Sequence, residues 1–401
     1  MKKRLSLSVL SLALAGAFAA SSAAAAPNEV VIGDIDDMSG VYADVIGQGG
    51  VEAIKMAIAD FGGSVLGKKI TILTADHQNK PDVGASKFRE WADQNGVNMI
   101  LGGSNTGVSI AMSKVAGQKK VPFIAIGAAG ASLTNEDCTP YSVHYAYDTT
   151  SLANGTASAI VQQGGKSWYF LTADYAFGTQ LRTAATEVVE KHGGKSLGEV
   201  RVPLGTTDFS SFLLQAQGSK AQVLGLANAG ADFTNSLKAA QEFGITKQMK
   251  PAALLAFISD IHSLGLKTAQ GLYLTTGWYW DLNDATRAWS KRYFSVMKKE
   301  ATMNQAAYYS ATLHYLNSVK AAGSTDPDKV MAEMKKEKIN DMFVKGGYIR
   351  ADGVMIHPMY VMQVKTPAES KYPWDYYKLV KTMSGEEAFG PITGKCQYAK
   401  K

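Results

Sequence analysis

The sequence is poor in the residues that bind metals, cross membranes or attract nucleic acids. It has only two cysteines and six histidines in 401 residues. The histidines, at positions 77, 144, 192, 262, 314 and 357, lack the spacing of metal ligands, so we expect no metal. No segment after residue 26 has the roughly 18 consecutive apolar residues of a membrane span. Residues 1–26 hold three of the 41 lysines and arginines and no acid, and the +3 left on the rest argues against nucleic-acid binding.

Common catalytic and nucleotide-binding motifs are missing too. The glycines of 102–107 are spaced like those of a phosphate-binding loop, but Val108 stands where that motif needs lysine. The same stretch lacks the last glycine of a nucleophile elbow. Asp34 follows the first strand directly, where a dinucleotide-binding chain would continue its glycine pattern. We therefore predict no catalytic residues and no cofactor.

The first 26 residues have the pattern of a secretory signal peptide. Lys2, Lys3 and Arg4 precede an apolar core at 5–20, and the alanines of 24–26 form a cleavage site. No cysteine follows that site, so we do not expect a lipid anchor. We predict cleavage near Ala26 and a mature chain in the periplasm, not inserted in the membrane.

Cys138 and Cys396 are the only cysteines of this predicted exported chain. An even pair in an oxidising compartment favours one disulfide, which would tie the C-terminal tail to the first half of the chain. Two separate thiols are the alternative.

The stretch 99–134 shows how the chain is organised. A short apolar strand leads into the small-residue loop 102–107, a helix follows, and a buried strand at 121–126 ends in a second small-residue loop. Ligands of parallel sheets bind at the carboxyl ends of strands, where helix N-termini favour anions and small residues expose backbone N–H groups. The stretch predicts a carboxylate-binding surface, with two ordinary tight turns as the plainer alternative.

The same alternation of strands and helices starts again at Ser167. It predicts an α/β protein with two parallel sheets, each covered by helices on both faces. The aspartates at 34, 36 and 37 do not fit a calcium loop, because Ser39 occupies its sixth position and no glutamate its twelfth. We therefore expect 34–50 to be a solvated loop from which Tyr42 reaches a ligand.

Four motifs, in this order along the chain, resemble those of a known family. They are the first strand with its loop (31–40), the stretch 101–109, the stretch 122–134 and the loop 174–178. Together with the signal peptide they resemble the periplasmic binding proteins of ABC importers of the leucine/isoleucine/valine type, the type I binding proteins. The resemblance covers essentially all of the mature chain. It implies two doubly wound parallel-sheet lobes, joined by three hinge crossings, that close on a ligand.

With crossovers near Tyr147, 276 and 347, lobe 1 would comprise 27–147 plus 276–347. Lobe 2 would comprise 148–275 plus 348–384, with a tail at 385–401. The expected site residues lie at strand ends or crossovers, and most are positions that the resemblance assigns: Tyr42, Asn105, Thr106, Gly107, Ala128, Ala129, Gly130, His144, Tyr147, Tyr175, Phe177, Asn228, Asp232, Phe257, Trp278 and Tyr279. For Trp278 and Tyr279, pocket wall and buried hinge packing are equally good interpretations.

One position departs from the amino-acid-binding members of the resembled family. They place an acid after a late lobe 2 strand to hold the ligand ammonium, whereas here that segment is apolar and includes Phe257. Burying an unpaired ammonium costs several kcal/mol. An aromatic or hydrophobic carboxylate is therefore the favoured ligand, and an amino acid with its ammonium on Asp232 is the alternative.

The expected function is that of a monomeric extracytoplasmic receptor that delivers a small organic acid to an ABC permease in the inner membrane. A sensory input protein would share the binding step. A secreted α/β enzyme would need a nucleophile with a base, or a metal site, and the sequence offers neither.

Overall fold

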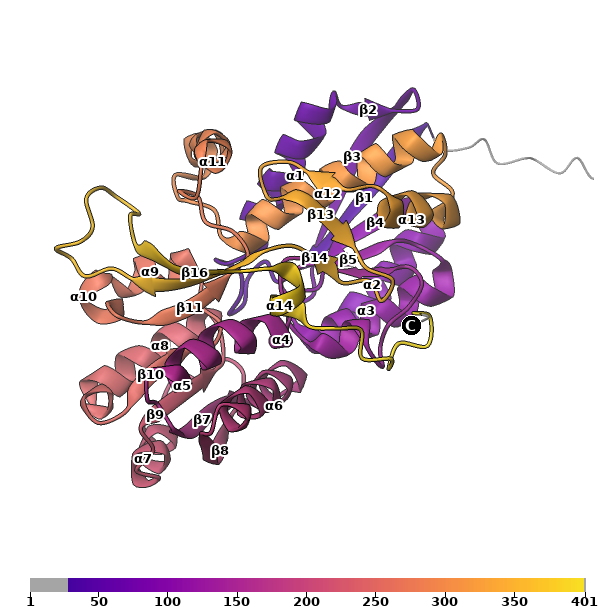
Figure 1. The fold of residues 1–401 in the computed structure, drawn as a ribbon. Coiled ribbons are helices and arrows are strands. Elements are labelled where there is room, and N and C mark those ends of the chain that lie inside the picture. Colours follow the sequence, from indigo (N-terminus) through magenta and orange to yellow (C-terminus); the bar gives the residue numbers. More distant parts are fainter. Residues whose placement is uncertain (1–27, 400–401) are drawn as a thin grey trace, which may run out of the picture.

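The computed structural model describes residues 28–399, which form two lobes side by side, each built around a parallel sheet (Figure 1). This confirms the predicted α/β class. The predicted signal peptide, residues 1–26, lies outside the described residues.

Lobe 1 contains a six-stranded sheet in the order β2-β3-β1-β4-β5-β6, parallel except for β2. Its strands are β1 (Glu29–Asp36), β2 (Ser64–Val65), β3 (Lys68–Asp76), β4 (Val97–Gly102), β5 (Phe123–Ala125) and β6 (Ser142–His144). Its helices are α1 (Gly47–Phe61), α2 (Pro81–Gln94), α3 (Thr106–Lys119), α11 (Asp284–Met297), α12 (Met303–Ala322) and α13 (Pro327–Lys336). Helix α1 packs on α12 and α2 on α3. The strand order reverses between β1 and β4, where such sheets bind ligands.

Lobe 2 contains a four-stranded parallel sheet in the order β10-β9-β7-β8. Its strands are β7 (Ser167–Ala173), β8 (Lys195–Val202), β9 (Val223–Ala227) and β10 (Lys250–Ala253). Its helices are α4 (Thr149–Leu152), α5 (Ser158–Gln162), α6 (Ala176–Lys191), α7 (Ser210–Gly218), α8 (Gly230–Glu242), α9 (Ile258–Leu264) and α10 (Leu266–Ala269). The strand order reverses here between β7 and β9, so each lobe has its own ligand-facing edge.

Two small antiparallel sheets complete the described chain. One joins β11 (Tyr273–Thr276), β15 (Met359–Val364) and β16 (Tyr377–Met383); the other joins β12 (Ile339–Asn340), β13 (Lys345–Ile349) and β14 (Met355–Ile356). Val354 pairs with His144 of β6. This pairing places Val354 beside lobe 1, and the lobe boundary expected at 347 stays a prediction.

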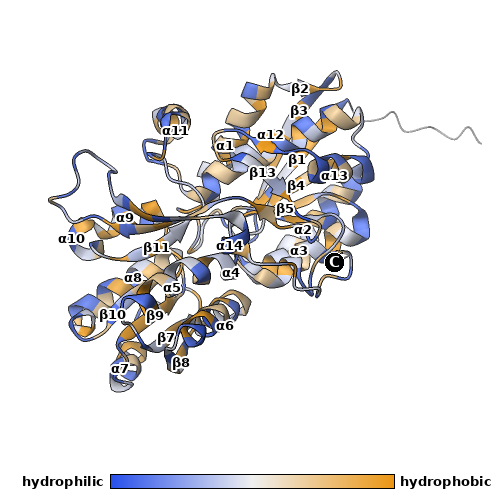
Figure 2. Ribbon diagram, in the orientation of Figure 1, coloured by the Kyte–Doolittle hydropathy of each residue, from blue (hydrophilic) through white to orange (hydrophobic). Residues whose placement is uncertain are grey.

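The hydrophobic pattern explains the layers. Figure 2 shows strands that are mostly hydrophobic and helices with one hydrophobic and one hydrophilic side. Strands covered on both faces read as continuous apolar runs, whereas a helix over a sheet buries a single stripe. Among the largest fully buried side chains are Phe88 and Phe123 in lobe 1, and Trp168 and Phe170 in lobe 2.

The expectation of a solvated loop at 34–50 is wrong for its first three aspartates. Asp34, Asp36 and Asp37 are each at most 1% exposed, because β1 continues to Asp36 inside the sheet. Asp37 accepts hydrogen bonds from the backbone N–H groups of Gly40 and Tyr42, 2.6 and 2.9 Å away. The buried carboxylate therefore fixes the loop that carries Tyr42.

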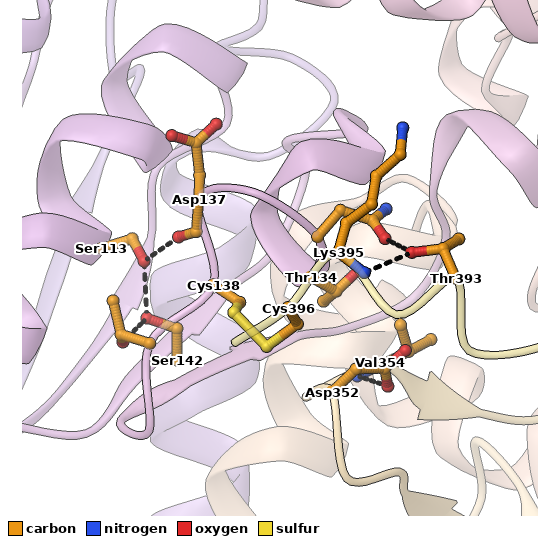
Figure 3. Close-up of a disulfide and its surroundings, with 12 residues drawn as sticks. Ser113, Thr134, Asp137, Cys138, Ser142, Asp352, Val354, Thr393, Lys395 and Cys396 are labelled. Atoms are coloured by element: carbon orange, nitrogen blue, oxygen red, sulfur yellow. Dashed lines mark hydrogen bonds between the residues drawn. A yellow bond between two sulfur atoms is a disulfide. The ribbon is translucent and has the colours of Figure 1, made fainter. Parts of the chain in front are cut away.

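The C-terminal tail is tied to lobe 1. A disulfide joins Cys138 and Cys396, the pairing favoured over two free thiols (Figure 3). The tail begins with α14 (Gly385–Phe389), which packs on α4 of lobe 2. Arg350 then donates to the carbonyl of Gly390 at 2.6 Å. The tail thus contacts both lobes before it reaches the disulfide.

Candidate ligand-binding site

A small cavity lies between the lobes, where the strands of both sheets end. Lobe 1 and the first crossing contribute Tyr42, Val45, Ser104, Gly127, Tyr147 and Asn304, and lobe 2 contributes Tyr175, Phe177, Ala229, Leu255 and Phe257. None of these described lining residues carries an ionisable carboxyl, amino or guanidinium group. An anion bound here would therefore depend on neutral donors and backbone dipoles.

Three long helices begin at the cavity wall. Tyr175 is the N-cap of α6, Ala229 is the N-cap of α8, and Asn304 is the second residue of α12. Neither Tyr175 nor Ala229 caps its helix with a side-chain hydrogen bond. A helix N-terminus carries a partial positive charge from its unpaired N–H groups, so these ends favour negative charge in the cavity.

Ser104 is held as a hydrogen-bond donor toward the cavity. The backbone N–H of Asn79 donates to Nδ1 of His77 at 3.0 Å, which assigns the ring proton to Nε2. That Nε2 lies 3.3 Å from the Ser104 Oγ, so the hydroxyl oxygen accepts and its own proton remains available. The backbone N–H of Ser104 donates to Asp36 at 3.1 Å and fixes the loop. A ligand carboxylate is the acceptor that this hydroxyl suits.

Aromatic rings form most of the remaining wall and connect the lobes. The hydroxyls of Tyr42 in lobe 1 and Tyr175 in lobe 2 lie 2.6 Å apart. The Tyr175 and Phe177 ring centroids are 5.8 Å apart, and those of Tyr147 and Phe257 are 6.3 Å apart. The lobes therefore meet around the cavity in a closed arrangement.

A second interlobe contact lies outside the cavity. The backbone N–H of Ser132 in lobe 1 donates to Gln180 of α6 at 3.1 Å, and the Gln180 amide donates back to the Ser132 hydroxyl at 3.1 Å. Near the loop of Tyr42, Ala231 N–H donates to the carbonyl of Val41 at 3.1 Å. These bonds hold the closed lobes on two sides of the cavity.

Two buried acids stand behind the lobe 2 wall. Burial raises the pKa of Asp232 to about 6, although an N–H bond from Gly205 opposes the shift. Burial also raises the pKa of Asp260, which accepts from the N–H of Phe257. Neither carboxyl lines the cavity.

Five of the expected site residues line the cavity: Tyr42, Tyr147, Tyr175, Phe177 and Phe257. The two small-residue loops of lobe 1 also line the cavity, but through other residues than those expected. Asn105 does not line the cavity; it caps α3, accepting from the N–H groups of Gly107 and Val108.

Thr106 faces the neighbouring loop, where its hydroxyl accepts from the N–H of Gly130 at 3.2 Å. Gly127 lines the cavity, but Ala128, Ala129 and Gly130 do not. Thr106 and the three residues 128–130 therefore lie behind the lining and support it.

The other expected residues are buried away from the cavity. His144 donates to the carbonyl of Ala128 at 2.7 Å, and burial lowers its pKa to about 4, so the ring is neutral. Asn228 bonds within α8, to the Asp232 carbonyl and the Ser236 hydroxyl.

The Trp278 and Tyr279 rings pack at the second crossing. Trp278 donates to the Met342 carbonyl at 3.3 Å, and Tyr279 to the Trp374 carbonyl at 3.2 Å. Of the two interpretations left open for these rings, the contacts favour hinge packing.

Sequence reasoning missed six lining residues: Val45, Ser104, Gly127, Ala229, Leu255 and Asn304. Three of them are direct neighbours of an expected residue: Ser104, Gly127 and Ala229. The sequence therefore identified the correct strand-end loops but chose the adjacent residue within each loop. Asn304 had no local signal, since it lies on a helix whose residues are buried on nearly every side.

The comparison with known proteins identifies this architecture. Residues 29–371 match the family model described as periplasmic binding protein. The chain belongs to the periplasmic binding protein family. The family matches the one inferred from the four motifs.

Three solved structures show how similar this binding protein is to its relatives. A periplasmic binding protein from Burkholderia mallei is 60% identical, with a TM-score of 0.92 over 93% of this chain and 100% of that one. A branched-chain amino acid ABC transporter ligand-binding protein from Burkholderia xenovorans is 38% identical, with a TM-score of 0.82 over 92% and 100%. A solute-binding protein from Rhodopseudomonas palustris in complex with 4-hydroxybenzoate is 22% identical, with a TM-score of 0.81 over 91% and 99%. This last likeness shows the fold.

The protein is thus a substrate-binding protein of an ABC transporter, and its relatives are binding proteins rather than enzymes. Within residues 28–399, every helix is too short or too polar to span a lipid bilayer. The same part of the chain has no group of three or more His, Cys, Asp or Glu side chains arranged to hold a metal ion.

Proposed function

We propose that this protein binds a small aromatic carboxylate between its lobes and delivers it to an ABC permease in the inner membrane. The observation that carries the proposal is a cavity walled by five aromatic rings, with an available Ser104 proton and no ionised side chain in its lining. A bound ring would exchange water for aromatic and aliphatic surface.

The binding geometry follows from the two walls. The carboxylate accepts a hydrogen bond from Ser104 on the lobe 1 side of the cavity. The ring lies against Phe177 and Phe257 when lobe 2 closes. Relatives of this fold hold such ligands, as the 4-hydroxybenzoate complex from Rhodopseudomonas palustris illustrates.

An amino acid remains the second candidate, supported by the description of the 38% identical Burkholderia xenovorans relative. Asp232 would then hold the ammonium. Its charge contributes to the raised pKa values of Tyr42 and Tyr175, so it lies close to two residues of the lining. The apolar lining at Phe257 and the raised pKa of Asp232 favour the aromatic acid over this candidate.

The cellular setting is part of the same proposal. Removal of the signal peptide near Ala26 would release the mature chain into the periplasm, where a disulfide between Cys138 and Cys396 is stable. There the protein would act as a monomer, without catalysis, and its lobes would close by motion at the three crossings.

A thermal-shift screen of the mature protein tests the ligand class. A ligand that binds only the folded state raises the melting temperature by mass action. We expect benzoate and hydroxybenzoates to raise the Tm by several degrees and leucine to leave it unchanged. A shift with leucine but not with the aromatic acids would overturn the proposal.

A further inference from the structure

We infer that Asn304 selects ligands that carry a ring hydroxyl, so that the preferred substrate is a hydroxylated aromatic carboxylate. This inference rests on the proposed function, since it assigns a second polar contact in the same cavity. The carrying observation is an unsatisfied hydrogen-bond acceptor. Asn304 is 1% exposed and lines the cavity, and its Oδ1 has no hydrogen-bond partner among the described residues.

Tyr147 is the polar neighbour of Asn304 in the cavity lining. The Tyr147 hydroxyl donates to the carbonyl of Gly127 at 2.9 Å, so its oxygen is left to accept. Burial raises the pKa of Tyr147, and a hydrogen bond with the Asn304 side chain opposes this rise, as a donor to the phenol oxygen would. Of the Asn304 amide atoms, Oδ1 is buried and without a partner among the described residues.

A buried acceptor without a partner is costly, and a ligand that supplies the missing donor recovers that cost. A carboxylate cannot do so, because it only accepts hydrogen bonds. The hydroxyl proton of a phenol can. Ser104 and Asn304 thus form a donor and an acceptor in one cavity, matched to a carboxylate and a hydroxyl on one ring.

The rest of the lining explains why Asn304 decides the preference. Leu255, Phe257 and Phe177 carry no polar side-chain atom, and the Tyr42 and Tyr175 hydroxyls bond to each other. Among the described lining side chains, Asn304 is the one that presents an unpaired buried acceptor. Its removal should abolish discrimination between hydroxylated and plain rings.

Isothermal titration calorimetry on the mature protein tests this with benzoate and its 2-, 3- and 4-hydroxy derivatives. We expect the better of the 3- and 4-hydroxy acids to bind about tenfold more tightly than benzoate. The 2-hydroxyl bonds to its own carboxylate, so 2-hydroxybenzoate should show no such gain. In Asn304→Leu the advantage over benzoate should fall to less than about twofold.

Thr312→Val is the matched control. Thr312 lies on the same helix, is fully buried, and its hydroxyl also lacks a partner among the described residues, but it does not line the cavity. Its replacement should leave the preference intact. Should Asn304→Leu fold poorly, Asn304→Ala also removes the acceptor, and the wild-type series alone already tests the inference.

The outcomes separate the two claims. Equal binding of benzoate and all its hydroxy derivatives by the wild type overturns the role of Asn304 and leaves the proposed function standing. A preference that survives in the Asn304 variants also overturns it. No binding of any aromatic acid overturns both.

Discussion

The lobe 1 wall and the lobe 2 wall of the cavity differ in polarity and, with it, in their expected roles in binding. Lobe 1 presents polar groups whose positions are fixed by buried hydrogen bonds, with Ser104 held by His77 and Asp36. Lobe 2 presents Phe177, Leu255 and Phe257, and its one polar side-chain atom in the lining, the Tyr175 hydroxyl, bonds across to lobe 1. The comparison indicates that lobe 1 recognises the ligand's polar groups, while lobe 2 supplies apolar burial when it closes.

The apolar wall is the place where a change should have the largest effect. In Phe257→Glu, the new carboxylate would lie in the cavity beside the ligand's own carboxylate without a counter-ion. Like charges brought together out of water cost several kcal/mol, so affinity for benzoate should fall by at least about a hundredfold. Calorimetry measures this. Phe257→Leu, which keeps the wall apolar, should lose less than about tenfold, and similar losses in both variants would contradict the account.

The polar wall should give the next largest effect. Ser104→Ala removes the donor to the ligand carboxylate, and a hydrogen bond to a charged group is worth about 1.5–3 kcal/mol, so Kd should rise about tenfold to a hundredfold. Ser109→Ala is the control. The Ser109 hydroxyl, buried nearby, donates to the carbonyl of Gly103 at 2.6 Å and does not line the cavity. An unchanged Kd in Ser104→Ala would show that the carboxylate binds elsewhere.

Loss of the hydrogen bond between the two walls should have a smaller effect, mainly on the rate at which the ligand dissociates. Tyr175→Phe removes the hydroxyl contact with Tyr42, which lies between the two lobes. A neutral hydrogen bond contributes about 0.5–1.5 kcal/mol, so ligand release should be about threefold to tenfold faster. Stopped-flow fluorescence follows the release. Tyr169→Phe, whose hydroxyl bonds within lobe 2 to Glu199, should leave the rate unchanged.

The smallest effect on affinity should come from Asp232, the acid behind the lobe 2 wall of the cavity. With its pKa raised to about 6, Asp232 is largely neutral at pH 5 and ionised at pH 7.5. The ionised form repels an anionic ligand, so benzoate affinity should fall as pH rises through 6, by less than about threefold because Asp232 lies outside the lining.

Asp232→Asn should abolish this pH dependence and keep the affinity that the wild type has at pH 5. An aromatic acid that binds more weakly to this variant at every pH would contradict the repulsion. Loss of leucine binding in the variant would instead favour the amino-acid candidate.

The sequence was a good guide to the sheets and a weaker one to individual side chains. Alternating elements predicted both parallel sheets and the loops at their ends, since that pattern is local. The pattern does not say which side chain of a small-residue loop faces the cleft. Gly102 and Gly103, with φ of +117° and +75°, turn the loop so that Ser104 rather than Thr106 reaches the cavity.

The remaining differences between expectation and structure arise from contacts between segments that are far apart in the sequence. Asp36 looks solvated in sequence, but it accepts hydrogen bonds from Ser104 and from Tyr308 of α12, a helix far along the chain. Asn304 belongs to the same helix, which is buried on nearly every side and shows no polar face that would mark one residue as special. Such positions become visible only when the two segments are brought together.

A crystal structure of the mature protein with 4-hydroxybenzoate tests the central claim most directly. The account predicts a carboxylate oxygen within hydrogen-bond distance of the Ser104 hydroxyl, a ring between Phe177 and Phe257, and the phenol donating to Asn304. A ring outside this cavity, or a carboxylate whose contacts come from lobe 2 alone, would contradict the division of work between the two walls.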